Sequence, residues 1–315
     1  MDRLTLFGLF AVTAMLVFYA LEARSRWFVL AFAAACVLGS IYGFLQGAWP
    51  FGIVEAIWSC VALRRWWLSS HSKIHFPASL EVTERQIDLS ALTQKQRDFY
   101  LNLFSEVMDI YQARHKSRVV VGIAGPTGAG KSVVAVLLRD LAKQAGLPFA
   151  LESITIDAYH HPNSYLYSHF ADGEALMKVK GRFDTYDVEG LARNLKSFAG
   201  GERVSFPTYS RKLHDPVKDG VVVQTDKALL IVEGLWLLYD KAGWDAVGSL
   251  LDYAIFIDAD TGRVKESVLK RHMTGGRTLE EASKHYELVD ARNSELVLTT
   301  RHKANRIIPP YYSVQ

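Results

Sequence analysis

The sequence is poor in cysteine and in excess charge, and both shortages exclude classes of function. Only two cysteines occur among 315 residues, Cys36 and Cys60, and both lie in apolar N-terminal stretches. So few cysteines give neither a disulfide framework nor a metal-ligand spacing, and a cysteine-free remainder suits a reducing cytoplasm. The formal net charge is only +3, so nothing in the composition demands a nucleic-acid partner.

Long apolar runs mark the N-terminal region. Residues 4–21 and 27–45 contain no charged side chain, and at about 1.5 Å per residue each run can cross the hydrocarbon core of a bilayer. A third run, residues 48–63, carries Glu55, so a short span, a re-entrant piece and an interfacial helix stay open. A cleaved signal peptide is disfavoured because a second apolar run follows at once, whereas a buried globular hairpin stays an alternative.

Arginines flank these runs. Arg24 and Arg26 follow the first run, and residues 64–65 are two more arginines at the end of the third. With three spans both clusters fall on one side of the membrane, which the positive-inside tendency assigns to the cytoplasm. We therefore expect residues 1–67 to form a transmembrane region of two or three helices in the cytoplasmic (inner) membrane, and residues 68–92 to form a linker.

A glycine-rich stretch follows the β-branched apolar run 118–124 and precedes an amphipathic run, residues 133–139. In this setting the pattern G-x-x-x-x-G-K-[ST] indicates a phosphate-binding P-loop. Its glycines let backbone N–H groups approach an anion, and the helix that follows presents its positive end to the same anion. The lysine then reaches the β- and γ-phosphates, and the serine hydroxyl ligates Mg²⁺. The predicted nucleotide-binding residues are Gly125, Pro126, Thr127, Gly128, Ala129, Gly130, Lys131 and Ser132.

Two further apolar runs end in an acidic residue. Residues 149–156 resemble a strand that ends at Asp157, and residues 228–232 resemble a buried strand that ends at Glu233. Ligands of doubly wound sheets sit at the carboxyl ends of the strands, so both acids are expected near the phosphates. We expect Asp157 to act as a general base and Glu233 to hold Mg²⁺ or its water ligand, with a turn or cap role as the alternative for each.

The C-terminal part adds a strand at residues 253–257 and a basic helix at 261–273. Two glycines separate that helix from a second helical stretch, residues 279–286. Two helices joined in this way are typical of a mobile lid that brings arginines over phosphates, although a solvated basic face is the alternative. The predicted fold class is α/β, with a P-loop NTPase-type, doubly wound, mainly parallel sheet and a helical lid in residues 93–315, preceded by an all-α transmembrane region.

An ordered series of motifs between residues 119 and 310 resembles the uridine kinase, pantothenate kinase and phosphoribulokinase superfamily. The motifs are the P-loop, Ile154–Tyr159, Asp184–Asp187, Pro207–His214, Ile231–Gly234, Asp258–Thr261, Gly276–Glu281 and Ala304–Pro309. By this resemblance, Asp157 accepts the proton of the substrate hydroxyl, and Glu233 supports Mg²⁺ beside Ser132. The resemblance also implies that Arg271 and Arg277 belong to the lid and stabilise the transferring phosphoryl group. The implied catalytic residues are Asp157, Lys131 and Arg271, and the implied substrate-binding residues are Tyr159, Tyr209, Arg211, His214 and Arg277.

The chain departs from the family pattern around the acceptor. Uridine kinases usually show Asp-x-Phe-Tyr after the second strand, whereas this chain has Tyr159 and His160 at the last two positions. Ser210 stands where an aspartate usually follows the substrate tyrosine, and Asn305 replaces another common aspartate. The acceptor therefore stays open among a nucleoside such as uridine, a pantothenate-like molecule and a sugar-like molecule.

These observations predict an ATP- and Mg²⁺-dependent phosphotransferase that acts on a hydroxyl of a small molecule. Its expected partners are that substrate and the lipid bilayer, and assembly into a homo-oligomer stays open. The alternatives are a P-loop NTPase switch and a nucleotide-binding membrane scaffold. Neither an N-K-x-D base-reading box nor an L-S-G-G-Q signature occurs in the sequence, which disfavours the switch.

Overall fold

The structure is a computed structural model that describes residues 3–22, 25–71, 74–171, 173–210 and 212–310. The chain forms two compact units, and the boundary between them lies between Ile74 and His75. Each unit has its own packing and is described by itself.

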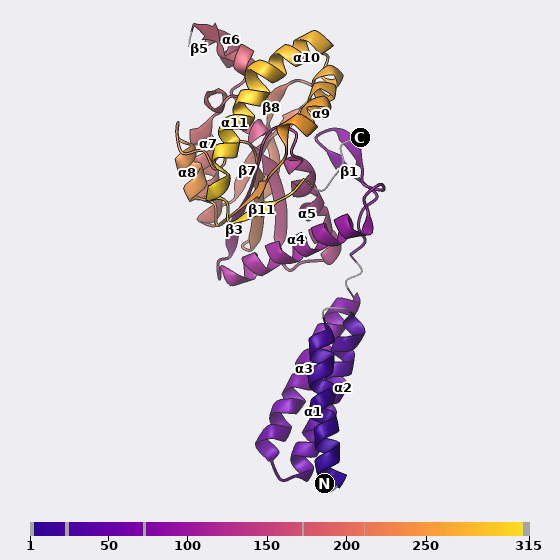
Figure 1. Ribbon diagram of the computed structural model, residues 1–315. Helices are drawn as coiled ribbons and strands as arrows, with labels where there is room; N and C mark the ends of the chain where they lie inside the picture. Colours follow the sequence, from indigo (N-terminus) through magenta and orange to yellow (C-terminus); the bar gives the residue numbers. More distant parts are fainter. Residues whose placement is uncertain (1–2, 23–24, 72–73, 172, 211, 311–315) are drawn as a thin grey trace. The chain divides into compact units, whose positions relative to one another are not determined.

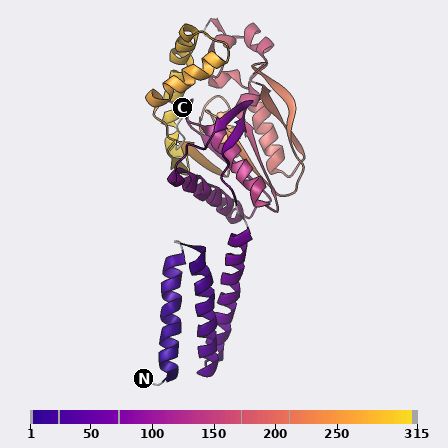
Figure 2. The ribbon, with the colours of Figure 1, turned by 90° about the vertical axis from the view of Figure 1, so that its right-hand side faces the viewer.

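Three helices make up the first unit: α1 (Arg3–Leu21), α2 (Arg26–Leu45) and α3 (Trp49–His71). Figure 2 shows them side by side. Two serine hydroxyls join α2 to α3, because Ser40 donates to the carbonyl of Gly52 at 2.7 Å and Ser59 to that of Ala33 at 3.0 Å. Arg65 of α3 pairs with Glu22 at 3.2 Å, so the end of α3 lies beside the first interhelical loop.

Two of these helices are long and apolar enough to cross a membrane. The stretches are residues 4–21 and 27–45, as expected, and only 11% of the first and 44% of the second is buried. A core helix of a soluble protein would be mostly buried. The third apolar run lies within α3, where every stretch of similar length includes Glu55 and two arginines.

A five-stranded parallel sheet forms the centre of the second unit. Its strand order is β11 (Arg306–Ile308), β10 (Tyr253–Ile257), β3 (Arg118–Ala124), β9 (Ala228–Glu233), β4 (Ala150–Thr155). All residues of β3 and β9 are buried. Parallel sheets are covered on both faces, which explains why both strands are apolar between the buried Arg118 at the start of β3 and Glu233 at the end of β9. The predicted doubly wound α/β class is confirmed.

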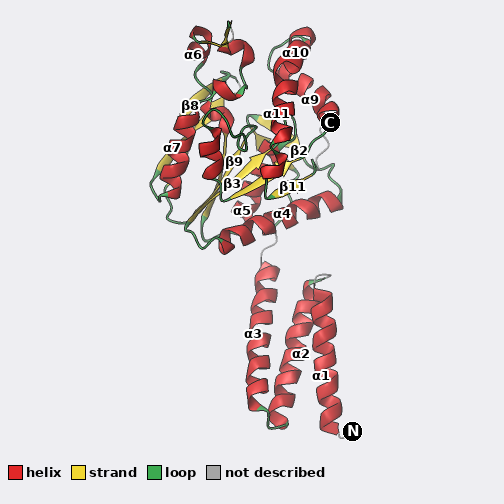
Figure 3. Ribbon diagram, turned by 60° about the vertical axis from the view of Figure 1, so that its left-hand side comes forward, coloured by secondary structure: helices red, strands yellow, loops and turns green. Residues whose placement is uncertain are grey.

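Helices cover the two faces of this sheet (Figure 3). α5 (Lys131–Ala145) packs on β3, β9 and β4 through its buried leucines. α7 (Val188–Ala199) packs on the other face, where its Leu191, Leu195 and Phe198 join a core with Val120 and the alternate residues of β9. Successive strand residues point to opposite faces, so both helices can pack on the same strands.

The chain before the sheet is also folded. β1 (Ser79–Val82) and β2 (Arg85–Asp88) form an antiparallel hairpin, and α4 (Gln94–Ala113) follows behind a capping box made by Thr93 and Gln96. β1 and α4 both contact α5. Residues 79–88, ten of the 25 residues expected to be a linker, therefore form a hairpin of the second unit.

The remaining elements connect the strands of the sheet or follow them. They are η2 (Ile156–Tyr159), α6 (Asn163–Ser168), β5 (Phe170–Ala171), β6 (Glu174–Ala175), η3 (Leu176–Val179), η4 (Phe183–Thr185), β7 (Val204–Ser210), β8 (Asp215–Val223), α8 (Trp244–Ser249), α9 (Thr261–Thr274), α10 (Leu279–His285), η5 (Tyr286–Asp290), α11 (Ala291–Thr299) and η6 (Arg301–Lys303). η5 is a π-helical turn. The predicted helical lid corresponds to α9 and α10, which Gly275 and Gly276 separate.

Candidate active site

The P-loop joins the central strand β3 to α5 (Figure 1). Gly125, Gly128 and Gly130 have φ values of 149°, 80° and 91°, a region that side chains other than glycine rarely adopt. At Gly125 a Cβ would also lie 2.6 Å from the carbonyl oxygen of Ile257 in β10. Glycine is therefore required at this turn, and the turn leaves the N-terminal end of α5 open to an anion.

Lys131 folds back over its own loop. Its Nζ donates to the carbonyl of Pro126 at 2.9 Å, and the side chain is buried. Burial lowers the pKa of Lys131 to about 8, against the opposing charges of Glu233 and Asp157. An anion bound in the loop would compensate this desolvated ammonium group.

Glu233 ends β9 next to the loop. Its Oε1 accepts a hydrogen bond from the Ser132 hydroxyl at 2.9 Å, and the residue is only 6% exposed. Burial and the charge of Asp157 raise the pKa of Glu233, while Lys131 and hydrogen bonds from Thr155 and Ser132 oppose the rise. A buried carboxylate beside a hydroxyl is the oxygen donor set that Mg²⁺ prefers, so these residues fit the cation.

Asp157 lies on η2, two residues past the end of β4. Parallel pairing aligns Thr155 of β4 with Glu233 of β9, so both acids reach the same edge of the sheet. The Thr155 hydroxyl links them, since it accepts from the backbone N–H of Asp157 at 3.2 Å and bonds to Glu233. The charge of Asp157 also acts on Lys131, so the structure brings together four of the residues expected at the phosphates.

His160 follows Asp157 and was not expected as a site residue. Its Nδ1 lies 2.9 Å from the carbonyl of Asp157, and a carbonyl only accepts, so Nδ1 carries the proton. Its Nε2 is buried and has no hydrogen-bond partner among the described residues. Burial lowers the pKa of His160 to about 4, so the ring stays neutral and Nε2 is an unused acceptor.

Aromatic rings surround His160. The ring of Tyr186 lies 3.9 Å from it and that of Tyr209 lies 5.8 Å away, measured between centroids. The Nζ of Lys180 lies 5.5 Å from the Tyr209 ring. Sequence analysis did not identify Tyr186 and Lys180 as site residues either, because the only feature that distinguishes them in the sequence is a position in or near a family motif. Together these residues form a polar and aromatic cluster beside Asp157.

The other expected substrate residues lie at different depths. Tyr159 is buried, and its hydroxyl accepts a hydrogen bond from Asn194 of α7 at 2.9 Å. It therefore belongs to the hydrophobic core behind the His160 cluster. His214 is exposed on the turn between β7 and β8, with its carbonyl bonded to Lys180 at 2.5 Å. Arg211 lies outside the described residues. Their roles as substrate contacts stay predictions.

A cavity of about 420 Å³ lies over the P-loop. Lys131 and Ser132 line it from below, Arg271 of α9 lines it from the lid, and residues 82–92 of the hairpin region form another wall. Arg85 of β2 donates to the carbonyl of Arg271 at 3.4 Å, which joins hairpin and lid. The cavity thus places one of the two predicted lid arginines above the phosphate loop.

Comparison with known proteins agrees with this geometry. The model of the phosphoribulokinase / uridine kinase family matches residues 120–313. The chain belongs to this family. It is therefore a small-molecule kinase with a P-loop.

Two groups of relatives have similar sequences. A protein of Escherichia coli K12 named YggC, described as uncharacterized, is 32% identical over 231 residues, which are 73% of this chain and 94% of the relative. A pantothenate kinase of Streptococcus equi is 28% identical over 207 residues, 65% of each chain. This chain thus spans slightly less than two thirds of that pantothenate kinase.

Solved structures share the fold. A Silicibacter protein described as a fructose transport system kinase superposes with a TM-score of 0.59 at 24% identity, over 67% of this chain and 98% of its own. Yeast YFH7, described as a P-loop kinase with a circular permutation, superposes with a TM-score of 0.55 at 17% identity, over 67% and 98%. At these identities the likeness concerns the fold alone.

Proposed function

We propose that the protein transfers the γ-phosphate of ATP to a hydroxyl group of a small polar molecule at the cytoplasmic face of a membrane. The observation that carries this proposal is the convergence of Asp157 and Glu233, linked through Thr155, beside Lys131 and Ser132. Such a group combines a base for an alcohol, oxygen donors for a cation and a cation for phosphates.

ATP and Mg²⁺ find matching residues here. The P-loop amides and Lys131 would hold the phosphates, and Ser132 and Glu233 would hold the magnesium ion. When bound, Mg²⁺ supplies charge neutralisation to the phosphate oxygens. The cavity walls formed by residues 82–92 lie over the same loop, so the hairpin would cover the rest of the nucleotide.

Asp157 would accept the proton of the attacking hydroxyl. Its backbone is fixed by Thr155 on one side and by the His160 ring on the other, so its position depends on hydrogen-bonded neighbours. A fixed carboxylate aligns the acceptor oxygen for attack, which is the main contribution that a protein makes to phosphoryl transfer.

The rest of the acceptor would lie against the cluster around His160. An unused buried acceptor atom costs about 1–3 kcal/mol, and a hydroxyl or N–H of the substrate would satisfy Nε2. Tyr186 and Tyr209 offer flat faces of the kind that sugar and nucleoside rings contact. The names of the family and its relatives suggest uridine, pantothenate and fructose. Each carries more than one hydroxyl, so one can be phosphorylated while another donates to Nε2.

The first unit would anchor the enzyme. α1 and α2 are apolar and largely exposed, and a bilayer would cover that surface. The Arg65–Glu22 contact places a basic residue of α3 beside the C-terminal end of α1, and the positive-inside tendency favours the cytoplasm for an end that carries arginine.

Phosphotransfer from labelled ATP tests the proposal. The full chain in detergent or vesicles is incubated with ATP, Mg²⁺ and a metabolite extract, and then with uridine, pantothenate and D-fructose singly. We expect a phosphate ester of at least one alcohol. Release of inorganic phosphate without any ester would favour the NTPase switch, and ATP binding without turnover would favour a scaffold.

A further inference from the structure

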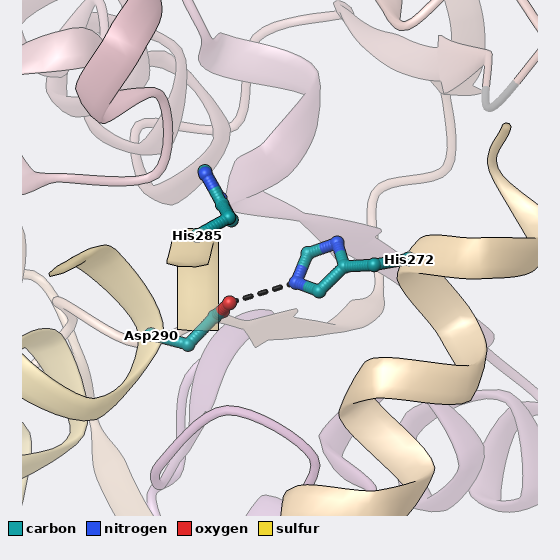
Figure 4. A group of neighbouring side chains, drawn as sticks. All are labelled: His272, His285 and Asp290. Atoms are coloured by element: carbon teal, nitrogen blue, oxygen red, sulfur yellow. Dashed lines mark hydrogen bonds and ion pairs between the residues drawn. The ribbon is translucent and has the colours of Figure 1, made fainter. Parts of the chain in front are cut away.

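The lid contains a cluster of three side chains outside the site described above. Ligand atoms of His272, His285 and Asp290 all lie within 4.8 Å of one another. Figure 4 shows the His272 ring, at the end of α9, facing the carboxylate of Asp290. Two histidines and an aspartate are common metal ligands, so these side chains alone would suit a divalent cation.

The neighbours of the cluster argue against a metal. Nε2 of His272 lies 2.7 Å from Asp290 Oδ2, and its Nδ1 lies 2.9 Å from Arg277 Nη1. Arg271 Nη2 lies 3.9 Å from Asp290 Oδ1. A metal ion would have to displace these hydrogen bonds and stay beside two permanent positive charges. Burial lowers the pKa of His285 to about 4, so this neighbour adds no charge near neutral pH.

The hydrogen bonds have only one consistent direction. A guanidinium group only donates, so Nδ1 of His272 accepts from Arg277 and carries no proton. Its Nε2–H then donates to Asp290. Although burial raises the pKa of Asp290, the His272 hydrogen bond and the charge of Arg271 outweigh it and hold the pKa below its usual value. The carboxylate is thus ionised and fixes the tautomer of His272.

The backbone that carries Asp290 is unusual. Tyr286–Asp290 (η5) forms a π-helical turn between α10 and α11, a conformation that is rare and often found at functional sites. The Tyr286 hydroxyl donates to the carbonyl of Thr261 at 3.0 Å, which ties this turn to the start of α9. Asp290 is therefore held against the helix that carries Arg271 and His272.

We propose that Asp290 and His272 are positioning residues that orient the lid arginines Arg271 and Arg277 toward the phosphates. This inference rests on the proposed phosphotransfer. Asp290 contacts Arg271, which lines the cavity over the P-loop, and acts on Arg277 through the His272 ring, which donates to Asp290 and accepts from Arg277. Arginines placed beforehand at a developing charge contribute strongly to phosphoryl transfer.

Asp290→Asn is the first test. The amide carries no charge, so the ion pair with Arg271 is lost and the hydrogen bond from His272 Nε2–H is weakened. We expect kcat to fall on the order of 10–100-fold, as for small misplacements of catalytic groups, with little change in KM for the acceptor. Glu287→Gln is the matched control, because Glu287 lies on the same turn but is 67% exposed and pairs only at 3.7 Å with Lys265. Its kcat should equal that of the wild type.

A double-mutant cycle separates positioning from structural damage. His272→Phe should lower kcat in the wild-type chain but have no further effect when Arg277 is already replaced by Gln, because His272 acts through that arginine. Losses that multiply in the double variant, or a fully active Asp290→Asn enzyme, would overturn the inference. Thermal unfolding of each variant checks that it is folded.

Nitrogen NMR of the full chain with labelled histidines tests the hydrogen-bonded chain Asp290–His272–Arg277, here called the relay, without an activity assay. The wild type should show His272 protonated at Nε2 and unprotonated at Nδ1, and the double variant Asp290→Asn, Arg277→Gln, in which both neighbours can donate or accept, should show a mixture of tautomers. A wild-type Nδ1 that carries a proton would contradict the relay. If the wild type transfers no phosphate to any acceptor, the proposed function fails, and this spectrum still decides the relay.

Discussion

The two units of the chain treat large apolar side chains in opposite ways. In the first unit Leu16 is 69% exposed and Phe10 is 63% exposed, whereas Trp236 and Trp244 of the second unit are fully buried. Exposed apolar surface of this extent needs a cover, and a core that buries its tryptophans does not. The comparison supports the proposal that the first unit enters a membrane and that the second unit carries out the chemistry.

Each unit also buries a glutamate, and the partners of the two glutamates differ. Glu55 of α3 has one carboxylate oxygen that is buried without a hydrogen-bond partner among the described residues. Glu233 is bonded to Ser132 and Thr155 and lies beside Lys131 and Asp157. Burial alone therefore does not indicate a functional carboxylate, and it is the polar partners of Glu233 that fit its proposed place beside Mg²⁺.

Removal of the first unit should move the protein from the membrane fraction to the soluble fraction, and this is the largest effect that we expect. A chain that begins at His75 should be soluble without detergent and keep phosphotransfer to a soluble acceptor, because the predicted catalytic residues lie in the second unit. The full chain should stay with the membrane fraction after a high-salt wash. Fractionation and a kinase assay measure both, and a full chain that stays in the supernatant contradicts the division of roles.

Replacement of one acidic residue in each unit by its amide extends this comparison to the active site. Asp157→Asn should lower kcat on the order of 10²–10⁴-fold, the usual contribution of a general base. Glu55→Gln, the matched change in the first unit, should leave kcat unchanged. Steady-state kinetics on the acceptor measure both, and equal effects of the two substitutions would remove the distinction.

Lys131 links stability to pH. Because burial lowers its pKa from 10.5 to about 8, the folded nucleotide-free protein is destabilised by the charged form at pH 7. Lys131→Met should therefore raise Tm at pH 7 without ATP and abolish stabilisation by MgATP. The advantage of the variant should shrink as pH rises from about 8 toward 10.5, where Lys131 is neutral in the folded state. Scanning calorimetry across this range would contradict the account if the difference stayed constant.

The smallest effect belongs to the helix contacts of the first unit. Ser40→Ala removes the 2.7 Å hydrogen bond to Gly52, and such bonds between membrane helices contribute about 0.6 kcal/mol. We expect a slightly lower unfolding midpoint in detergent and unchanged kinase activity. A loss of activity would show that the packing of the first unit controls the second.

Local patterns made part of the structure predictable. The P-loop, the strands around it and the acids at their ends follow from strand-length apolar runs and from the rule that parallel strands end at one edge. The β1–β2 hairpin lies in the stretch expected to be a linker, because most residues of its short strands are polar. Its role in the cavity depends on packing against α5, which no local pattern encodes.

Long-range side-chain geometry escaped prediction for a similar reason. The pairing of His272 with Asp290 depends on a π-helical turn, which no helical periodicity reveals. The unused Nε2 of His160 becomes visible only when its burial and its bond to Asp157 are known. Sequence motifs locate chemistry, but the contacts that orient it need coordinates.

The stoichiometry of the reaction tests the central claim most directly. ADP and phosphate ester are counted in the same reaction mixture for the full chain, with the Asp157→Asn variant beside it. We predict one ester for each ADP in the wild type and a sharp fall of both products in the variant. ADP formed with inorganic phosphate alone, at a rate that neither an acceptor nor the substitution changes, would contradict the account.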